Sequence, residues 1–249
     1  MMQRVIEAQR IRAVLTAILI VGVLALVAER AGYAGVYGGS ANLRSIGFQL
    51  LLAIPATAYL GALYRGAVVV PIDPNGEIET VTNFLENSET KLAFLSPNQT
   101  EKFAQIEEKL GRHIPAVVWR MENPANGFQR FEDWTATDFP ESFAREAPPA
   151  AGDDTALLIY TSGTTGVPKG VPLTHGNIVA ELDGINEVLR LSDKEKILSL
   201  LPLFHAYLQI VNLWVATTYG CEVGYLKEMT PDELSRAMKD FKPTILTTV

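Results

Sequence analysis

The sequence predicts an α/β fold in which helices cover mostly parallel sheets. From about residue 50 onward, short apolar runs rich in β-branched residues alternate with segments whose apolar residues recur at helical spacing. Repeated strand–helix units of this kind form parallel sheets with helices on their faces. The chain has 249 residues, of which 48% are hydrophobic and 20% charged, and this composition excludes disorder over the whole length.

Turn residues separate the expected elements of the first half of the chain. Gly66 is a helix stop, and Pro71 ends a β-branched run. A helix is expected from Ile78, because Val81 and Leu85 follow it at helical spacing. In chain order, the expected elements are a helix over 50–64, a strand over 67–70, a turn over 73–76, a helix from 78, a strand over 92–95, a helix over 101–110 and a strand over 117–119.

The second half of the chain follows a stretch of different composition. Residues 135–154 combine prolines with alanine and acidic residues, which is typical of a linker or a long surface loop. Beyond it we expect strands over 156–160 and 170–173, a helix from 174, a strand over 197–201, a helix over 208–219, a strand over 222–225, a helix from 231 and a strand over 244–249. One face of the helix from 174 is expected to be apolar through Ile178, Leu182, Ile185, Val188 and Leu189.

The start of the last expected helix has the residue pattern of a helix cap. Thr230 is followed by Pro231 and, three residues after the threonine, by Glu233. This spacing is that of a capping box with proline in the first helical turn. The strand over 244–249 then reaches the end of the sequence, and from this we expect a fragment or a truncated product.

The N-terminal region, residues 1–58, is hydrophobic and contains an uncharged run over 13–28 that follows Arg4, Arg10 and Arg12. A membrane-spanning helix needs about 20 apolar residues, so this run is short for one. Two interpretations stay open: a membrane-associated segment with a basic flank, and a buried element of the core. The expected location is cytoplasmic, or membrane-associated on the cytoplasmic side.

The charge balance argues against a general nucleic-acid binder, and the small number of cysteines and histidines argues against a metal site built from them. Lys and Arg number 21 against 28 Asp and Glu, which gives a net charge of −7. A general nucleic-acid binder needs a basic surface, so no nucleic-acid partner is expected. The one cysteine, Cys221, and the three widely spaced histidines predict no metal site built from these residue types.

The segment 161–170 carries the clearest chemical signal, because it joins two expected strands and is rich in glycine, hydroxyl groups and one lysine. Successive backbone N–H groups in such a loop form an anion-binding concavity, and an ammonium group adds positive charge for a polyphosphate. The lysine is followed by glycine, so the loop is not a Walker A motif, which counts against a P-loop phosphotransferase. The candidate phosphate-binding residues are Thr161, Ser162, Gly163, Thr164, Thr165, Gly166 and Lys169.

The string from Tyr160 to Val171 resembles the AMP-binding signature of the adenylate-forming enzymes, a superfamily that includes acyl-CoA synthetases, luciferases and peptide-synthetase adenylation domains. Residues 66–74, 173–177 and 201–206 resemble further motifs of the same superfamily. The resemblance covers residues 59–249. It implies that this part of the chain is the first part of the large N-terminal domain, a partial and truncated AMP-binding domain.

The resemblance also implies a reaction. Members of the superfamily activate a carboxylic acid with ATP and Mg²⁺ to an acyl-adenylate, and the acyl group then passes to a thiol, commonly that of coenzyme A. By motif position, the 161–169 residues listed above hold the β- and γ-phosphates, and His205 lines the acid side of the site. The block 198–249 is most like long-chain fatty acyl-CoA synthetases, so a fatty acid or another carboxylate is the expected substrate.

Several family segments have no counterpart in this sequence, including the Tyr-Gly-x-Thr-Glu and Tyr-x-Thr-Gly-Asp motifs and the C-terminal domain with its catalytic lysine. We therefore expect this chain alone to contribute phosphate-loop contacts without completing adenylation. The alternative is a truncated, catalytically inactive protein that associates with a membrane or serves as an interaction module. The sequence makes no prediction about oligomeric state.

Overall fold

A computed structural model of the chain describes residues 58–119, 121, 127–135, 150–161, 168–200, 203–226 and 229–247. The side chains of Trp134 and Thr135 are outside this description, as are residues 1–57 with the predicted membrane segment 13–28. Within the described ranges, no helix combines the length and the apolar character needed to cross a bilayer.

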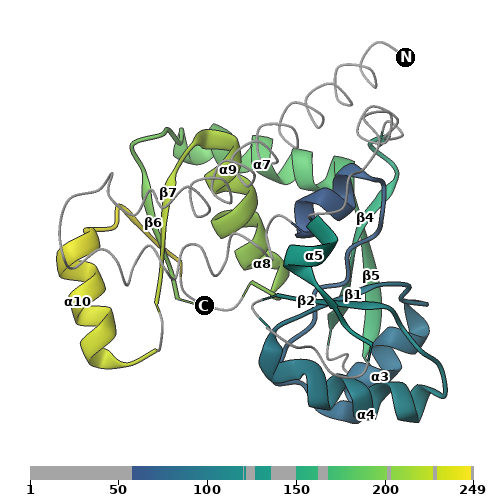
Figure 1. Cartoon of the computed structure of the whole chain (residues 1–249). Helices are drawn as coiled ribbons and strands as arrows, with labels where there is room; N and C mark the ends of the chain where they lie inside the picture. The colour runs from purple at the N-terminus through teal and green to yellow at the C-terminus, as the bar shows by residue number, and fades with distance from the viewer. Residues whose placement is uncertain are drawn as a thin grey trace. The chain divides into compact units, whose positions relative to one another are not determined.

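The fold class is confirmed as mixed α/β with parallel sheets (Figure 1). The chain forms two compact units. The described part of unit 1 comprises 58–71, 150–157 and 173–247, and that of unit 2 comprises 72–135 and 158–172, with the gaps given above. Two strands, β4 (Thr155–Thr161) and β5 (Lys169–Thr174), pair with each other and run through both units.

Unit 2 contains a three-stranded sheet in the order β1-β2-β3, formed by Ala93–Leu95, Ala116–Val118 and Gln129–Arg130. Both pairings are parallel. A short 3-10 turn, η1 (Pro97–Gln99), and the helix α4 (Thr100–Leu110) connect β1 to β2, and α5 (Phe131–Thr135) follows β3. The helix α3 (Ile78–Asn87) packs on α4, so the predicted elements between 73 and 119 are confirmed.

The core of unit 2 is apolar. The buried face of α3 supplies Val81 and Leu85, and α4 supplies Phe103 and Ile106. These side chains pack on the sheet and its flanks through Ile114, Ala116, Val118 and Phe128. Burial of this apolar surface is the main term that stabilises the unit, at about 25 cal/mol per Å².

Unit 1 contains a second parallel sheet in the order β7-β6-β8, formed by Glu222–Tyr225, Lys196–Ser199 and Ile245–Thr247. β6 is the central strand and is buried along most of its length. The helix α10 (Pro231–Phe241) connects β7 to β8, and the ring of Phe241 lies 3.1 Å from the position that a Cβ of Gly224 would take. This close approach explains why β7 carries glycine at that position.

The predicted helix over 208–219 is confirmed and is longer than expected. It begins with α8 (Ala206–Leu208), continues as the π-helix η2 (Gln209–Val215) and ends with α9 (Ala216–Tyr219). Gly220 follows with φ 74°, a left-handed conformation that favours glycine at a helix end. A π-helical stretch is rare and, where it occurs, is frequently at a functional site.

The helix α7 (His175–Leu189) partly corrects the sequence prediction. Ile178 and Leu182 are buried as expected, but Val188 and Leu189 are 80% and 58% exposed. The burial ends near Leu182, whose carbonyl oxygen accepts a hydrogen bond of 3.0 Å from the Tyr219 hydroxyl. The rest of α7 extends past this contact. Apolar residues therefore recur at helical spacing over a longer part of α7 than the part that is buried.

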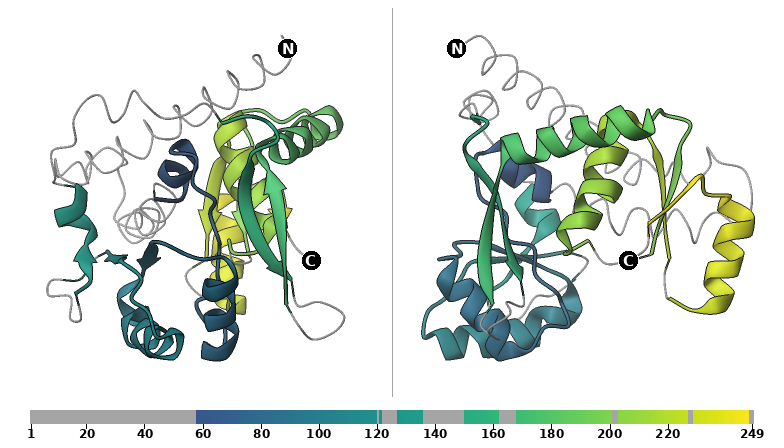
Figure 2. Two further views of the ribbon diagram at one scale, coloured as in Figure 1. Left: turned by 90° about the vertical axis from the view of Figure 1, so that its right-hand side faces the viewer. Right: turned by 180° about the vertical axis from the view of Figure 1, so that it is seen from behind.

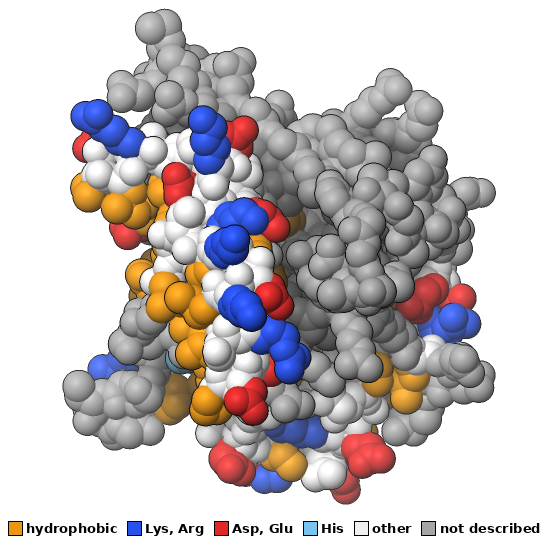
Figure 3. All heavy atoms as spheres, turned by 90° about the vertical axis from the view of Figure 1, so that its left-hand side faces the viewer, with side chains coloured by type: hydrophobic (Ala, Val, Ile, Leu, Met, Phe, Trp, Pro, Cys, Tyr) orange, Lys and Arg blue, Asp and Glu red, His pale blue; other side chains and the backbone are white. Residues whose placement is uncertain are grey.

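Other differences from the sequence-based expectations are small. The expected strand over 67–70 forms only an isolated parallel bridge, between Val69 and Leu157. The helix α10 has no fully buried side chain. Of its predicted capping box, the N-cap half is confirmed, because Thr230 Oγ1 accepts a hydrogen bond from the Glu233 N–H, while no return bond from the Glu233 side chain to the Thr230 N–H is formed. Figure 2 shows both sheets and their helices from two further directions. Figure 3 shows the side of the molecule on which α10 lies in Figure 1, where hydrophobic side chains reach the surface beside charged ones.

Candidate functional site

The predicted phosphate loop connects the paired strands β4 and β5. Thr161 is the last residue of β4 and Lys169 is the first residue of β5, and both are exposed. Among the described residues, Lys169 forms neither an ion pair nor a hydrogen bond, so its ammonium group is available to an anion. The remaining predicted loop residues, Ser162, Gly163, Thr164, Thr165 and Gly166, lie outside the described part of the chain.

The N-terminal side of this loop is anchored on α3 through Tyr160. Its ring stacks on that of Phe84, with 4.1 Å between the ring centroids and 9° between the planes. The Tyr160 hydroxyl lies 2.7 Å from Asn87 Oδ1 and 3.3 Å from the Phe84 carbonyl oxygen. Burial raises the pKa of Tyr160 above its ordinary value, so the hydroxyl stays a hydrogen-bond donor at neutral pH.

The C-terminal side of the loop packs against the same ring. A Cβ added to Gly170 would lie 3.1 Å from Leu158 Cδ1 and 3.3 Å from Tyr160 Cε1. A side chain at this position would therefore require the Leu158 and Tyr160 side chains to shift. The glycine in the signature has a structural reason here, which is close strand approach.

His205 lies in unit 1, at the start of the helix that contains η2. It is the N-cap residue of α8, with extended backbone angles, and its side chain is exposed. Its carbonyl oxygen accepts hydrogen bonds of 3.1 Å from the N–H groups of Leu208 and Gln209. Its ring lies 4.4 Å from the ring of Phe204. The structure thus places His205 on a rigid helix start, while Thr161 and Lys169 belong to unit 2.

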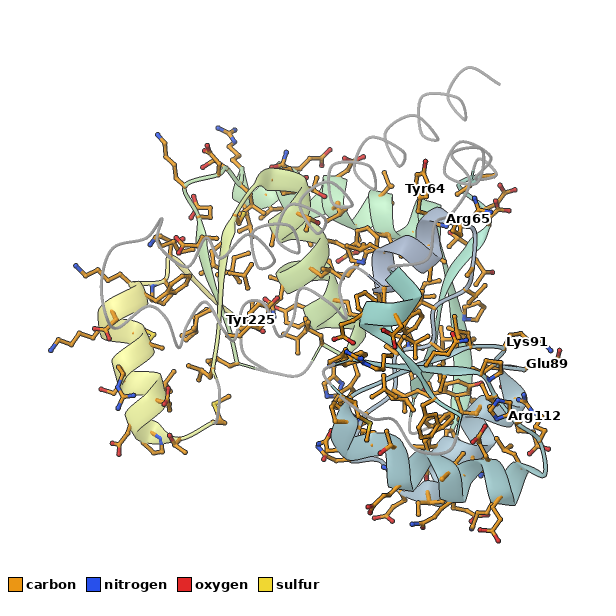
Figure 4. The ribbon with its side chains drawn as sticks, viewed as in Figure 1. Tyr64, Arg65, Glu89, Lys91, Arg112 and Tyr225 are labelled. Atoms are coloured by element: carbon orange, nitrogen blue, oxygen red, sulfur yellow. The ribbon has the colours of Figure 1, made fainter. Side chains whose placement is uncertain are left out.

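Two buried amides on η2 were not found by the sequence analysis. Gln209 and Asn212 are each only 1% exposed, although the segment is otherwise apolar. Asn212 Nδ2 donates to Ser199 Oγ at 2.6 Å, and its backbone oxygen lies 3.4 Å from the Tyr225 hydroxyl. Figure 4 labels Tyr225 beside this part of the sheet. A helix with an apolar average gives no local signal that an amide within it is buried.

The Asn212 cluster lies at the carboxyl ends of three parallel strands. Ser199, Tyr225 and Thr247 are the last residues of β6, β7 and β8, and Ser199 is paired with both of the others in the register. Burial raises the pKa of Tyr225 to about 12. In open α/β sheets, ligands bind outside the carboxyl ends of the strands. The Asn212 cluster therefore lies at the edge of unit 1 where a binding site is expected.

Gln209 forms its own buried contact with Tyr59, from the helix over 58–64. The Tyr59 hydroxyl donates to Gln209 Oε1 at 2.8 Å, and its ring meets that of Trp214 edge to face at 6.3 Å. Burial raises the pKa of Tyr59, and the Trp214 side chain opposes the rise. Gln209 Nε2 has no hydrogen-bond partner among the described residues.

His175, which the sequence analysis interprets as a helix-start residue, has that structural position. Thr174 caps α7, because its Oγ1 accepts from the Asn177 N–H at 3.1 Å and its own N–H donates to Asn177 Oδ1 at 3.0 Å. His175 is 5% exposed, and burial lowers its pKa, with a smaller opposing effect from Asp154. A buried neutral histidine of this kind is part of the core of unit 1.

The described residues offer no cluster of three or more histidine, cysteine or acidic side chains that could hold a metal ion. Cys221 is half-buried, and burial together with Glu195 raises its pKa. No described residue is assigned to a metal.

A solved structure shares this fold. The chain aligns with ATP-bound MatB from Rhodopseudomonas palustris with a TM-score of 0.63 at 24% sequence identity, over 78% of this chain and 36% of that one. At this identity the likeness concerns the fold alone. The class of protein is therefore an α/β domain of the kind found in that ATP-bound protein.

The chain belongs to the AMP-binding enzyme family, whose sequence profile matches residues 56–249. It is 28% identical over 204 residues to the long-chain-fatty-acid–CoA ligase heimdall of Drosophila melanogaster, covering 75% of this chain and 29% of that protein. It is 31% identical over 168 residues to the sulfoacetate–CoA ligase of Cupriavidus necator, covering 68% and 31%. The chain thus spans about a third of the length of these curated relatives.

Proposed function

We propose that this chain supplies the phosphate-binding part of an ATP-dependent acid–CoA ligase. In the complete reaction, a carboxylate attacks the α-phosphate of ATP, an acyl-adenylate forms and pyrophosphate leaves. The sulfur of coenzyme A then attacks the acyl carbonyl, a thioester forms and AMP leaves. The observation that carries the proposal is the 161–170 segment between β4 and β5, which ends on Lys169, an exposed residue whose side chain pairs with no described residue.

The described residues fit a polyphosphate. Thr161 offers a hydroxyl and Lys169 an ammonium group at the two ends of the loop, and the signature residues between them complete the proposed phosphate contacts. When bound, Mg²⁺ would neutralise part of the phosphate charge. Its ligands are not assigned to described residues.

The proposed substrate is a carboxylic acid, with long-chain fatty acids as the first class to test. The apolar side chains Leu208, Leu213 and Val215 on the helix after His205 support an apolar acid, and the relatives act on acids as different as fatty acids and sulfoacetate. In this proposal His205 lines the acid side of the site. The buried amides Gln209 and Asn212 argue against a wholly apolar wall.

The proposal is tested by measuring ATP binding to the 249-residue chain by calorimetry, with and without Lys169→Ala. Loss of one charge-assisted contact is expected to weaken binding about tenfold or more. Lys194→Ala, an exposed lysine next to β6, is the matched control and is expected to leave the affinity unchanged. Equal affinities for the wild-type chain and Lys169→Ala would contradict the phosphate-binding role.

A further inference from the structure

Both ends of the phosphate loop rest on one aromatic ring. Tyr160 directly precedes Thr161, and Gly170 directly follows Lys169. The Tyr160 ring stacks on Phe84, and its Cε1 lies 3.3 Å from the position that a Cβ of Gly170 would take. Thr161 and Lys169, the two described residues proposed to contact phosphate, are therefore each adjacent in the sequence to a residue of this packing.

The hydroxyl group of the same ring fixes the rotation of the side chain. Tyr160 Oη is 2.7 Å from Asn87 Oδ1, and Asn87 is the last residue of α3. A stacked ring without this bond would retain freedom to slide on Phe84. The hydrogen bond and the stack together define where β4 ends.

The C-terminal turn of α3, on which the Tyr160 side chain packs, is itself held by hydrogen bonds from Arg112. Arg112 donates from Nη1 to the Thr90 carbonyl oxygen at 3.0 Å and from Nη2 to the Leu85 carbonyl oxygen at 3.1 Å. These bonds place a positive charge at the C-terminal end of α3, where the helix dipole favours it. Figure 4 labels Arg112 together with Glu89 and Lys91, which lie just after α3. The C-terminal turn of α3 is thus a fixed surface for Tyr160.

We propose that Tyr160 and Asn87 are positioning residues for nucleotide binding, because they set the direction in which the loop leaves β4 and returns to β5. This inference rests on the proposed function. Neither side chain needs to touch the nucleotide. They act by holding Thr161 and Lys169 at a fixed separation before the phosphates arrive, and such preorganisation raises affinity.

The test measures ATP binding to the full 249-residue chain by calorimetry. Tyr160→Leu removes the stack and the hydrogen bond and is expected to weaken binding about tenfold. Asn87→Ala removes the 2.7 Å hydrogen bond, and Tyr160→Phe removes that bond together with the 3.3 Å contact to the Phe84 carbonyl oxygen. We expect about threefold weaker binding for each single variant and no further loss in the double variant beyond that of Tyr160→Phe, because Asn87 acts through the Tyr160 hydroxyl. Losses that multiply in the double variant would overturn the pairing of Tyr160 with Asn87.

A stability control separates positioning from general weakening of unit 2. Phe103→Leu alters the core of the same unit, at a residue that contacts Phe128 and is not part of the Tyr160 packing. It is expected to lower the melting temperature and to leave the ATP affinity unchanged. If Phe103→Leu weakens binding as much as Tyr160→Leu, the positioning role is wrong.

The experiment also distinguishes this inference from the proposed function. If Lys169→Ala loses affinity while the Tyr160 and Asn87 variants bind like the wild-type chain, the positioning role alone is overturned. If the wild-type chain shows no saturable ATP binding, or if Lys169→Ala changes nothing, the proposed function fails and this inference fails with it. Faster amide hydrogen exchange in β4 and β5 of Tyr160→Leu, with no change in Lys169→Ala, is the expected accompanying result.

Discussion

The two units differ in how they bury polar side chains. In unit 2 the buried polar residues Thr82 and Thr100 satisfy their hydroxyl groups within their own helical turns, through the carbonyl oxygens of Ile78 at 2.7 Å and Pro97 at 2.9 Å. In unit 1, four buried polar side chains instead bond to partners in other elements of the fold. These residues are Ser199, Gln209, Asn212 and Thr247.

The difference shows which unit depends on apolar packing and which on long-range polar contacts. Unit 2 packs α3, α4 and a sheet around an apolar cluster, and it contains both ends of the predicted phosphate loop, Thr161 and Lys169. Unit 1 places amide and hydroxyl groups at the carboxyl edge of its sheet, where each must keep its partner. A buried polar group that loses its partner costs about 1–3 kcal/mol.

The largest expected effect tests the apolar core of unit 2. Ile106 is 2% exposed, and Ile106→Ala leaves a cavity between α4 and its neighbours. We expect a loss of about 2–5 kcal/mol in the free energy of unfolding, measured by urea denaturation. Val188→Ala, at a residue that is 80% exposed on α7, is the control and should change it by less than about 0.5 kcal/mol.

A second substitution tests the polar core of unit 1. Asn212→Ala removes a buried amide that donates to Ser199 Oγ, and we expect a loss of about 1–3 kcal/mol in the free energy of unfolding. Asn98→Ala, in the exposed turn η1, is the matched control. Equal effects of the two substitutions would contradict the structural role of the Asn212 contact.

Replacing two glycines of α7 by alanine is expected to change the free energy of unfolding in opposite directions. A Cβ at Gly176 would lie 2.8 Å from the backbone oxygen of Gly152, so Gly176→Ala is expected to cost about 1–3 kcal/mol. Gly184, in the middle of the same helix, has no atom within 4 Å of the added Cβ. Gly184→Ala should therefore stabilise the protein by about 0.5–1 kcal/mol. Melting curves of both variants check the pair.

The smallest expected effect is a pH dependence that belongs to unit 1. Burial holds the pKa of His175 below its ordinary value, so the unfolded chain binds a proton more readily than the folded chain. Stability contributed by neutral His175 is complete above the unfolded pKa of about 6.5 and decreases as the pH falls below it. Unfolding measured between pH 7.5 and pH 5 should show this loss. His175→Asn should flatten it, whereas His205→Gln, at an exposed residue, should keep it.

The sequence was sufficient to predict features that depend on local chemistry. The turn over 73–76 is confirmed by the bond of 3.0 Å from the Gly76 N–H to the Asp73 carbonyl oxygen. The amphipathic spacing of α3 and the cap at Thr230 were likewise readable, because each depends on residues within one or two turns.

The remaining features depend on contacts between distant residues. Tyr160 and Asn87 are 73 positions apart, and Tyr59 and Gln209 are 150 positions apart, so no local pattern predicts either pair. For the same reason the spacing of α7 predicted burial of Val188 and Leu189, which is wrong because the packing ends before them. Of the candidate site, the residue types and the loop position were predictable, whereas the support for the loop on α3 was not.

The most direct test of the account is a crystal structure of the 249-residue chain grown with ATP. We predict that the β- and γ-phosphates lie at the loop between β4 and β5, with Lys169 Nζ and Thr161 Oγ1 within hydrogen-bond distance of phosphate oxygens. A structure in which the nucleotide binds elsewhere, with Lys169 extended into solvent and no anion at the loop, would contradict the account.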